Sequence, residues 1–154
     1  MIVTFCGHAD FSEHQRCRPI LLSLLEQKIG KTPTDFYLGG YGAFDAFAYA
    51  CCKEFQATHP QVKLIYVTPY LADRHLKTLS EQYDSILYLP IENAPPKYAI
   101  SYRNREMIQR ADWVVAYVTR NYGGAYQTYR FAQNLKKEIF NLIGDSNEHR
   151  QKQV

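Results

Sequence analysis

Short runs of β-branched and aromatic residues alternate with amphipathic helical segments along the whole chain, and this alternation limits the folds open to it. Each run ends near a glycine or a proline, as strands do at turns. Strands that alternate with helices form βαβ units, which place helices over a mainly parallel sheet. The expected strands span residues 2–6, 35–38, 62–68, 85–89, 112–119 and 138–142. The expected helices follow Pro19 to Ile29, Phe44 to Phe55, Leu76 to Tyr83, Lys97 to Arg110 and Ala125 to Leu135.

This pattern predicts an α/β, Rossmann-like three-layer fold with a mainly parallel sheet of about six strands. The chain has 154 residues, of which 46% are hydrophobic and 21% charged, as in a folded globular domain. We find no internal repeat, linker or low-complexity segment. We therefore expect a single domain over residues 1–144, followed by a polar C-terminal tail over 145–154.

Charge and cysteine content exclude several classes of protein. The net charge of +3 is too small to indicate a dedicated nucleic-acid binder, so nucleic acid is not the expected partner. No apolar run approaches the roughly 20 residues that span a bilayer, and the N-terminus lacks the features of a signal peptide. The four cysteines match no common zinc spacing and are interpreted as reduced thiols. We expect a cytoplasmic protein without a membrane partner, a metal or a cofactor.

Glycines mark three of the predicted strand ends, at Gly7, in the loop from Gly39 to Gly42, and at Gly123-Gly124. Two of these loops lead directly into a predicted helix. Glycine lets a ligand approach the backbone, and a helix N-terminus offers free N–H groups and partial positive charge. GxGxxG and GxxxxGK[ST] motifs are both absent. The loops predict a nucleotide-type site at the carboxyl edge of the sheet, the alternative being purely structural turns.

A predicted helix places Arg103 and Met107 on one face, four residues apart. If Met107 packs inward, the Arg103 guanidinium lies near the core and needs an anion or a carboxylate. That anion is a ligand group, or else Arg103 pairs with a structural acid such as Asp112 or Glu92. Asn104 is a candidate to hydrogen-bond a ribose or to anchor a loop.

Other polar residues near the strand ends have two interpretations each. Asp45 lies three residues after Gly42, where it either binds ribose hydroxyls or caps the helix, and Asp10 is equally ambiguous. Several of the thirteen tyrosines are candidates to stack on a base, although each alone also suits a half-buried position. The possible metal ligands of the N-terminal loop match no zinc pattern, and Cys6 with His8 does not by itself make a catalytic dyad. Those possible ligands are Cys6, His8, Asp10, His14 and Cys17.

Taken in order, six short stretches resemble the SLOG superfamily, a group of Rossmann-like domains. The superfamily includes the lonely-guy phosphoribohydrolases and the DNA-processing protein A fold. Within it, the chain looks like the small bacterial SLOG family proteins. The stretches span residues 4–8, 36–45, 67–71, 99–107, 111–118 and 123–126, so the resemblance runs over nearly the whole chain.

The resemblance implies binding of a nucleotide or nucleotide derivative. In the lonely-guy enzymes an arginine on one helix works with the Glu of a PGGxGTxxE loop in glycosidic cleavage. Arg103 corresponds to that arginine, Gly123-Gly124 fall in the loop, and Gln127 is nearest to the catalytic acid. Glutamine does not ionise and no proline precedes the glycines, so the resemblance implies binding without this hydrolase activity. Ala9 stands where the small proteins favour an arginine, which removes one expected phosphate contact.

We therefore expect a domain that binds or senses a nucleotide-type small molecule. One alternative is an N-glycosidase acting on a nucleoside monophosphate, with Arg103 and an acid such as Glu106 or Asp45 as catalytic candidates. A second is a DNA-associated protein, and the resemblance also implies a homodimer. The expected ligand-binding residues are Gly7, His8, Gly39, Gly40, Tyr41, Gly42, Asp45, Arg103, Asn104, Gly123, Gly124, Ala125 and Tyr126.

Overall fold

The computed structural model describes residues 1–70, 76–91 and 94–144, which build one six-stranded sheet. All neighbouring strands are parallel, in the order β4-β3-β2-β1-β5-β6. The strands are β1 (Ile2–Gly7), β2 (Thr34–Leu38), β3 (Val62–Thr68), β4 (Ser85–Tyr88), β5 (Trp113–Tyr117) and β6 (Glu138–Asn141). The helices are α1 (His14–Ile29), α2 (Gly42–Thr58), α3 (Leu76–Gln82), α4 (Pro96–Arg110) and α5 (Gly124–Asn134). The predicted Rossmann-like α/β fold is confirmed.

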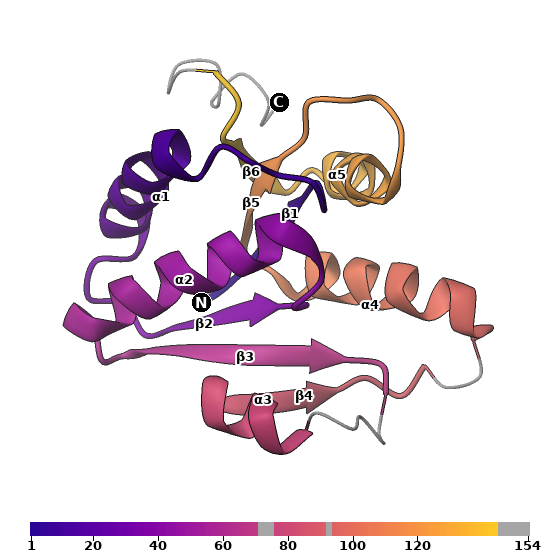
Figure 1. Ribbon diagram of the computed structural model, residues 1–154, viewed down its shortest axis with the longest axis horizontal. Helices are drawn as coiled ribbons and strands as arrows, with labels where there is room; N and C mark the ends of the chain where they lie inside the picture. Colours follow the sequence, from indigo (N-terminus) through magenta and orange to yellow (C-terminus); the bar gives the residue numbers. More distant parts are fainter. Residues whose placement is uncertain (71–75, 92–93, 145–154) are drawn as a thin grey trace.

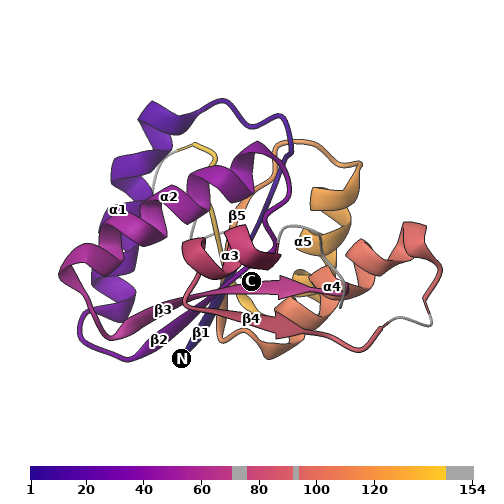
Figure 2. The same cartoon turned by 60° about the horizontal axis from the view of Figure 1, so that its bottom comes forward.

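Helices cover both faces of the sheet (Figure 1 and Figure 2). On one face, apolar side chains of α1, α2 and α3 pack against β1 and β2 in a single core cluster that includes Leu21, Phe36 and Phe44. On the other face, α4 and α5 pack against the sheet through two smaller clusters. The cluster around Ile108 includes side chains of β5 and β6, and the cluster around Met107 includes side chains of β2 and β3. The result is the expected three-layer arrangement.

Strand order reverses beside β1, which lies between β2 and β5. The chain runs outward from β1 to β4 and then returns to form β5 on the other side of β1. The loop after β1 leads to α1 on one face, whereas the loop after β5 leads to α5 on the opposite face. A crevice forms between such diverging loops, at the carboxyl edge of the sheet, and this is where open α/β sheets bind ligands.

Two predicted helix boundaries are wrong. Helix α1 begins at His14, not at Pro19, and Pro19 lies inside it. The proline lies in the second turn, where it removes one backbone donor, and Cys17 and Leu21 bury the face of the helix on either side of it. Leu135, predicted to be on the apolar stripe of the last helix, lies just past α5 and is exposed. The positive φ of Lys136, 58°, turns the chain there towards β6.

The predicted tail over residues 145–154 lies outside the described residues. Among the helices that are described, none has the length and apolar character needed to cross a membrane.

Candidate functional site

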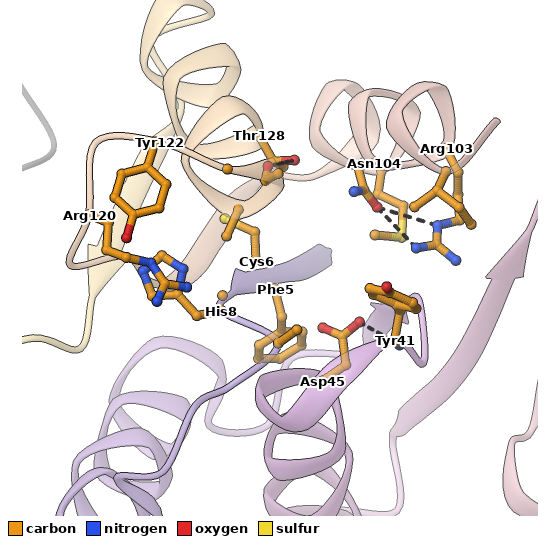
Figure 3. A pocket seen from close by; sticks show the side chains of 17 residues that line it. Phe5, Cys6, His8, Tyr41, Asp45, Arg103, Asn104, Arg120, Tyr122 and Thr128 are labelled. Atoms are coloured by element: carbon orange, nitrogen blue, oxygen red, sulfur yellow. Dashed lines mark hydrogen bonds between the residues drawn. The ribbon is translucent and has the colours of Figure 1, made fainter. Parts of the chain in front are cut away.

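A cavity of about 260 Å³ opens at the switch point, where the loops after β1, β2 and β5 meet α4 (Figure 3). Its walls come from four segments that are far apart in the sequence. The lining residues are Phe5, Cys6, Gly7, His8 and Ala9 at the end of β1, Tyr41 and Asp45 around the start of α2, Ile100, Arg103, Asn104 and Met107 of α4, and Arg120, Tyr122, Gly123, Gly124, Ala125 and Thr128 around the start of α5.

Nine of the thirteen expected ligand-binding residues line this cavity: Gly7, His8, Tyr41, Asp45, Arg103, Asn104, Gly123, Gly124 and Ala125. The other four, Gly39, Gly40, Gly42 and Tyr126, do not line it, and neither does the catalytic candidate Glu106. The Glu106 carboxylate instead lies 3.4 Å from the guanidinium of Arg110 on the same helix. Binding by the lining residues remains a prediction.

Two of the loop glycines, Gly39 and Gly42, do not line the cavity but make room for residues that do. The nearest guanidinium nitrogen of Arg103 would lie 2.8 Å from a Cβ at Gly39, so glycine there makes room for the arginine. Gly42 has a φ of 89°, and a Cβ there would lie 2.8 Å from the Cα of Ala9. The glycine loop after β2 therefore permits the close approach of α4 and of the β1 loop.

Arg103 is 3% exposed and extends from α4 into one side of the cavity (Figure 3). Its Nη1 donates to the Gly39 carbonyl oxygen at 2.9 Å, and its Nε and Nη2 donate to Asn104 Oδ1 at 3.3 and 3.2 Å. Burial lowers the pKa of this guanidinium, and the charge of Asp45 acts in the opposite direction. Asp112, one of the two proposed structural partners, instead accepts the Ile2 N–H at 2.7 Å.

Glu92, the other proposed partner of Arg103, lies outside the described residues. Among the carboxylates that the structure describes, none lies within ion-pair distance of Arg103. Neutral oxygens hold the guanidinium in place, and the nearby Asp45 carboxylate offsets part of its charge without forming an ion pair.

Asp45 extends into the same side of the cavity from the first turn of α2. Its Oδ2 accepts the Tyr41 N–H at 2.8 Å, so the capping role considered from the sequence is present. Burial raises the pKa of this carboxyl to about 6, against the lowering effects of the Tyr41 N–H and of the Arg103 charge. Because Asp45 also lines the cavity, capping and ligand contact do not exclude each other.

His8 and Cys6 form part of the cavity wall near the end of β1. His8 is buried, and its Nε2 accepts the Thr119 N–H at 2.9 Å, which anchors the loop after β5. Burial and the nearby Arg120 charge lower the His8 pKa, and a ring whose Nε2 accepts the Thr119 N–H is neutral and carries its proton on Nδ1. Burial raises the pKa of the Cys6 thiol to about 12, which rules out a reactive thiolate at neutral pH.

Arg120 lies at the opposite side of the cavity from Arg103, and it was not among the residues predicted for the site (Figure 3). Its two terminal nitrogens each donate to one Asp10 carboxylate oxygen at 3.0 Å, which links the loop after β1 to the loop after β5. The guanidinium carbon lies 5.5 Å from the centre of the Tyr122 ring, and Tyr122 is 64% exposed. A basic residue three positions before Gly123-Gly124 was the available signal.

The N-terminus of α5 faces the cavity without a side-chain cap. Gln127 N–H bonds to the Gly123 carbonyl at 3.0 Å, but no described residue accepts the N–H groups of Gly124, Ala125 or Tyr126. Gly124 and Ala125 line the cavity, and a Cβ at Gly124 would meet no atom within 4 Å, so the space beside the start of α5 is open. Free N–H groups and the helix dipole favour an anion at this position.

The described residues contain no group of three or more His, Cys, Asp or Glu side chains placed to hold a metal ion. Over its described residues, the cavity thus combines free N–H groups at the start of α5 with polar side chains from α2 and α4, namely Asp45, Arg103 and Asn104.

Comparison with known proteins shows similarity in structure only. No protein-family model matches the chain, and no curated protein is similar to it in sequence. The chain superposes on DNA processing protein A from Helicobacter pylori, whose structural report describes a unique single-stranded DNA binding mode, with a TM-score of 0.64 and 19% identity over 92% of this chain and 64% of that one. It superposes on DNA processing protein A from Streptococcus pneumoniae with a TM-score of 0.66 and 17% identity, over 98% of this chain and 53% of that one.

The chain thus spans less than two thirds of the length of either of these proteins. At such low identity the likeness concerns the fold and not the binding residues. The chain shares the Rossmann-like fold found in DNA processing protein A.

Proposed function

We propose that the cavity binds an anionic small molecule of the nucleotide type. The observation that carries the proposal is the lining of one cavity by a buried guanidinium, Arg103, and by the uncapped N-terminus of α5. Both features attract anions, and they belong to different walls. The cavity volume of about 260 Å³ is just below the roughly 300 Å³ at which typical small-molecule sites begin, which limits an occupant to about the size of a mononucleotide.

The position of the carboxylates supports binding more than glycosidic cleavage. Asp45 is the one carboxylate among the described lining residues. The other acid considered, Glu106, does not line the cavity and pairs with Arg110. An N-glycosidase mechanism would therefore have to use Asp45. Release of free base from nucleoside monophosphates, followed by chromatography, tests this alternative directly.

Isothermal titration of the full chain with the four ribonucleoside 5′-monophosphates tests the proposal. The variant Arg103→Met keeps an unbranched apolar stem but removes the charge, and we expect it to weaken binding about tenfold or more. Arg105→Met is the matched control, because Arg105 lies on the same helix, is exposed and contacts Phe131. No binding of any nucleotide to the unmodified chain would refute the proposal, as would equal affinity of Arg103→Met and the unmodified chain.

Association with single-stranded DNA is the second candidate. The modest net charge argued against nucleic acid, but the fold likeness to a protein described as binding single-stranded DNA weakens that argument. Fluorescence anisotropy with a labelled oligothymidine tests it, and binding by this route has to weaken steeply between about 50 and 200 mM salt. Salt-independent or undetectable binding would eliminate this candidate.

A further inference from the structure

The charged groups of the cavity are distributed unevenly between its sides. Arg120 and the N-terminus of α5 lie on one side, while Asp45 lies on the other, near Tyr41 and Arg103 (Figure 3). Asp45 offsets part of the Arg103 charge on its own side of the cavity, whereas no carboxylate among the described lining residues lies beside the free N–H groups of α5, which attract a phosphate. The anionic end of a ligand therefore belongs at α5, and an uncharged part of the ligand faces Asp45.

The Asp45 carboxylate has unused capacity to accept hydrogen bonds. Its Oδ2 is bonded to the Tyr41 N–H at 2.8 Å, but no described residue donates to its Oδ1. An ionised carboxylate only accepts hydrogen bonds, so the complementary ligand group is a donor. Desolvation raises the pKa of this carboxyl to about 6, and a hydrogen-bond donor from a ligand would favour its ionised form.

Asn104 provides a donor on the opposite wall. Its Oδ1 accepts from Arg103 Nε and Nη2, which fixes the amide orientation and leaves Nδ2 without an acceptor among the described residues. Figure 3 shows the Asn104 nitrogen directed away from Arg103 and towards the cavity, with Asp45 across from it. A free acceptor and a free donor that line one cavity match hydroxyl groups, which both donate and accept.

We propose that Asp45 selects ribonucleotides over deoxyribonucleotides by accepting a hydrogen bond from the ribose diol, with Asn104 donating to the same diol. This inference rests on the proposed function and makes it more specific, since it names the sugar and the orientation of the ligand. A site built to bond a hydroxyl discriminates against an analogue that lacks it, because its own polar group is then left unpaired.

Isothermal titration at pH 7.5, with each ribonucleoside 5′-monophosphate and its 2′-deoxy counterpart, tests the inference on the full chain. We expect the ribonucleotide that binds best to bind about tenfold or more tightly than its deoxy form. Equal affinities within every pair would overturn the inference and leave the proposed function standing. Absence of binding by all eight compounds would refute both.

Variants of Asp45 separate this role from general anion binding. In Asp45→Asn, and in Asp45→Ala as a second variant, the ratio of ribo to deoxy affinity is expected to fall close to one. The deoxynucleotide affinity should stay unchanged or rise, because a repulsive charge is removed. Glu54→Gln is the matched control on α2, since Glu54 pairs with Arg18 outside the cavity. A ratio unchanged in both Asp45 variants, with circular dichroism showing a native fold, would contradict the inference.

Discussion

Replacing the Asp45 carboxylate by an amide is expected to stabilise the ligand-free protein at neutral pH. Burial raises the pKa of Asp45 from 3.8 to about 6, so folding opposes ionisation of this group. A group with a raised pKa in the folded state adds its full stabilisation below the unfolded value of 3.8, and this stabilisation is lost as the pH rises through about 6. The amide side chain of the variant Asp45→Asn stays neutral at every pH and avoids that loss.

The size of the effect follows from the pKa shift of about two units. At about 1.4 kcal/mol per unit, the ionised carboxylate costs roughly 3 kcal/mol at pH 7.5, and below about 1 kcal/mol at pH 4. Loss of a negative charge from the first turn of α2 offsets about 0.5–1 kcal/mol of the gain. The amide oxygen can still accept the Tyr41 N–H, so that bond adds little to the difference. The net gain is about 2 kcal/mol at pH 7.5.

Urea unfolding of both chains at pH 4 and pH 7.5 measures this difference in the free energy of unfolding. Asp84→Asn is a control of opposite sign. Although partial burial acts to raise the Asp84 pKa, hydrogen bonds from the Leu64 N–H and the Gln56 amide lower it overall. The Asp84 variant should therefore lose stability at pH 7.5. A less stable Asp45→Asn at pH 7.5, or an equal gain at both pH values, would refute the reasoning.

Three further predictions concern the loops and the thiols. Gly42→Ala is expected to lower the free energy of unfolding by more than about 1 kcal/mol, because φ is 89° and the new Cβ would lie 2.8 Å from the Cα of Ala9; an unchanged urea midpoint would contradict this. Gly124→Ala should change the free energy of unfolding by less than about 1 kcal/mol, since no atom lies within 4 Å of the new Cβ. It should nevertheless weaken nucleotide binding in titration calorimetry, because the new methyl group lies beside the α5 donors, and an unchanged affinity would count against anion binding at α5. All four cysteines are buried with raised pKa values, so a colorimetric thiol reagent should react with none of them in the folded protein and with all four in urea; fast labelling without denaturant would show that one of them is accessible.

The succession of strands and helices along the chain, and the buried face of each helix, were predictable because hydrophobic periodicity is a local property of the sequence. The spacing of Arg103 and Met107 placed the arginine beside the core, where the structure has it. Contacts between distant segments were not predictable. The ion pair of Arg120 with Asp10 joins residues 110 positions apart. Both residues lie in loops, where no helix or strand periodicity predicts which residues meet.

The contact between Gly39 and Arg103 could not be predicted either, for the same reason. The sequence marked it as a glycine that a ligand approaches, whereas the structure places the Arg103 guanidinium against it, 64 positions away in the chain. A glycine that admits a side chain and a glycine that admits a ligand look alike in a single sequence. Only the packing of α4 across the sheet distinguishes them.

The β1–β5 ladder has a mechanical consequence. It pairs Val3 with Trp113 through to Gly7 with Tyr117, and it joins β1–β4, which precede α4 in the chain, to β5 and β6, which follow it. The cavity lies at the carboxyl end of this strand pair, and its walls come from both halves of the sheet. An occupant that contacts both Asp45 and the start of α5 would link the two halves of the sheet and oppose local opening of the β1–β5 pair. Filling the cavity should therefore slow amide hydrogen exchange along β1 and β5 more than in the outer strands.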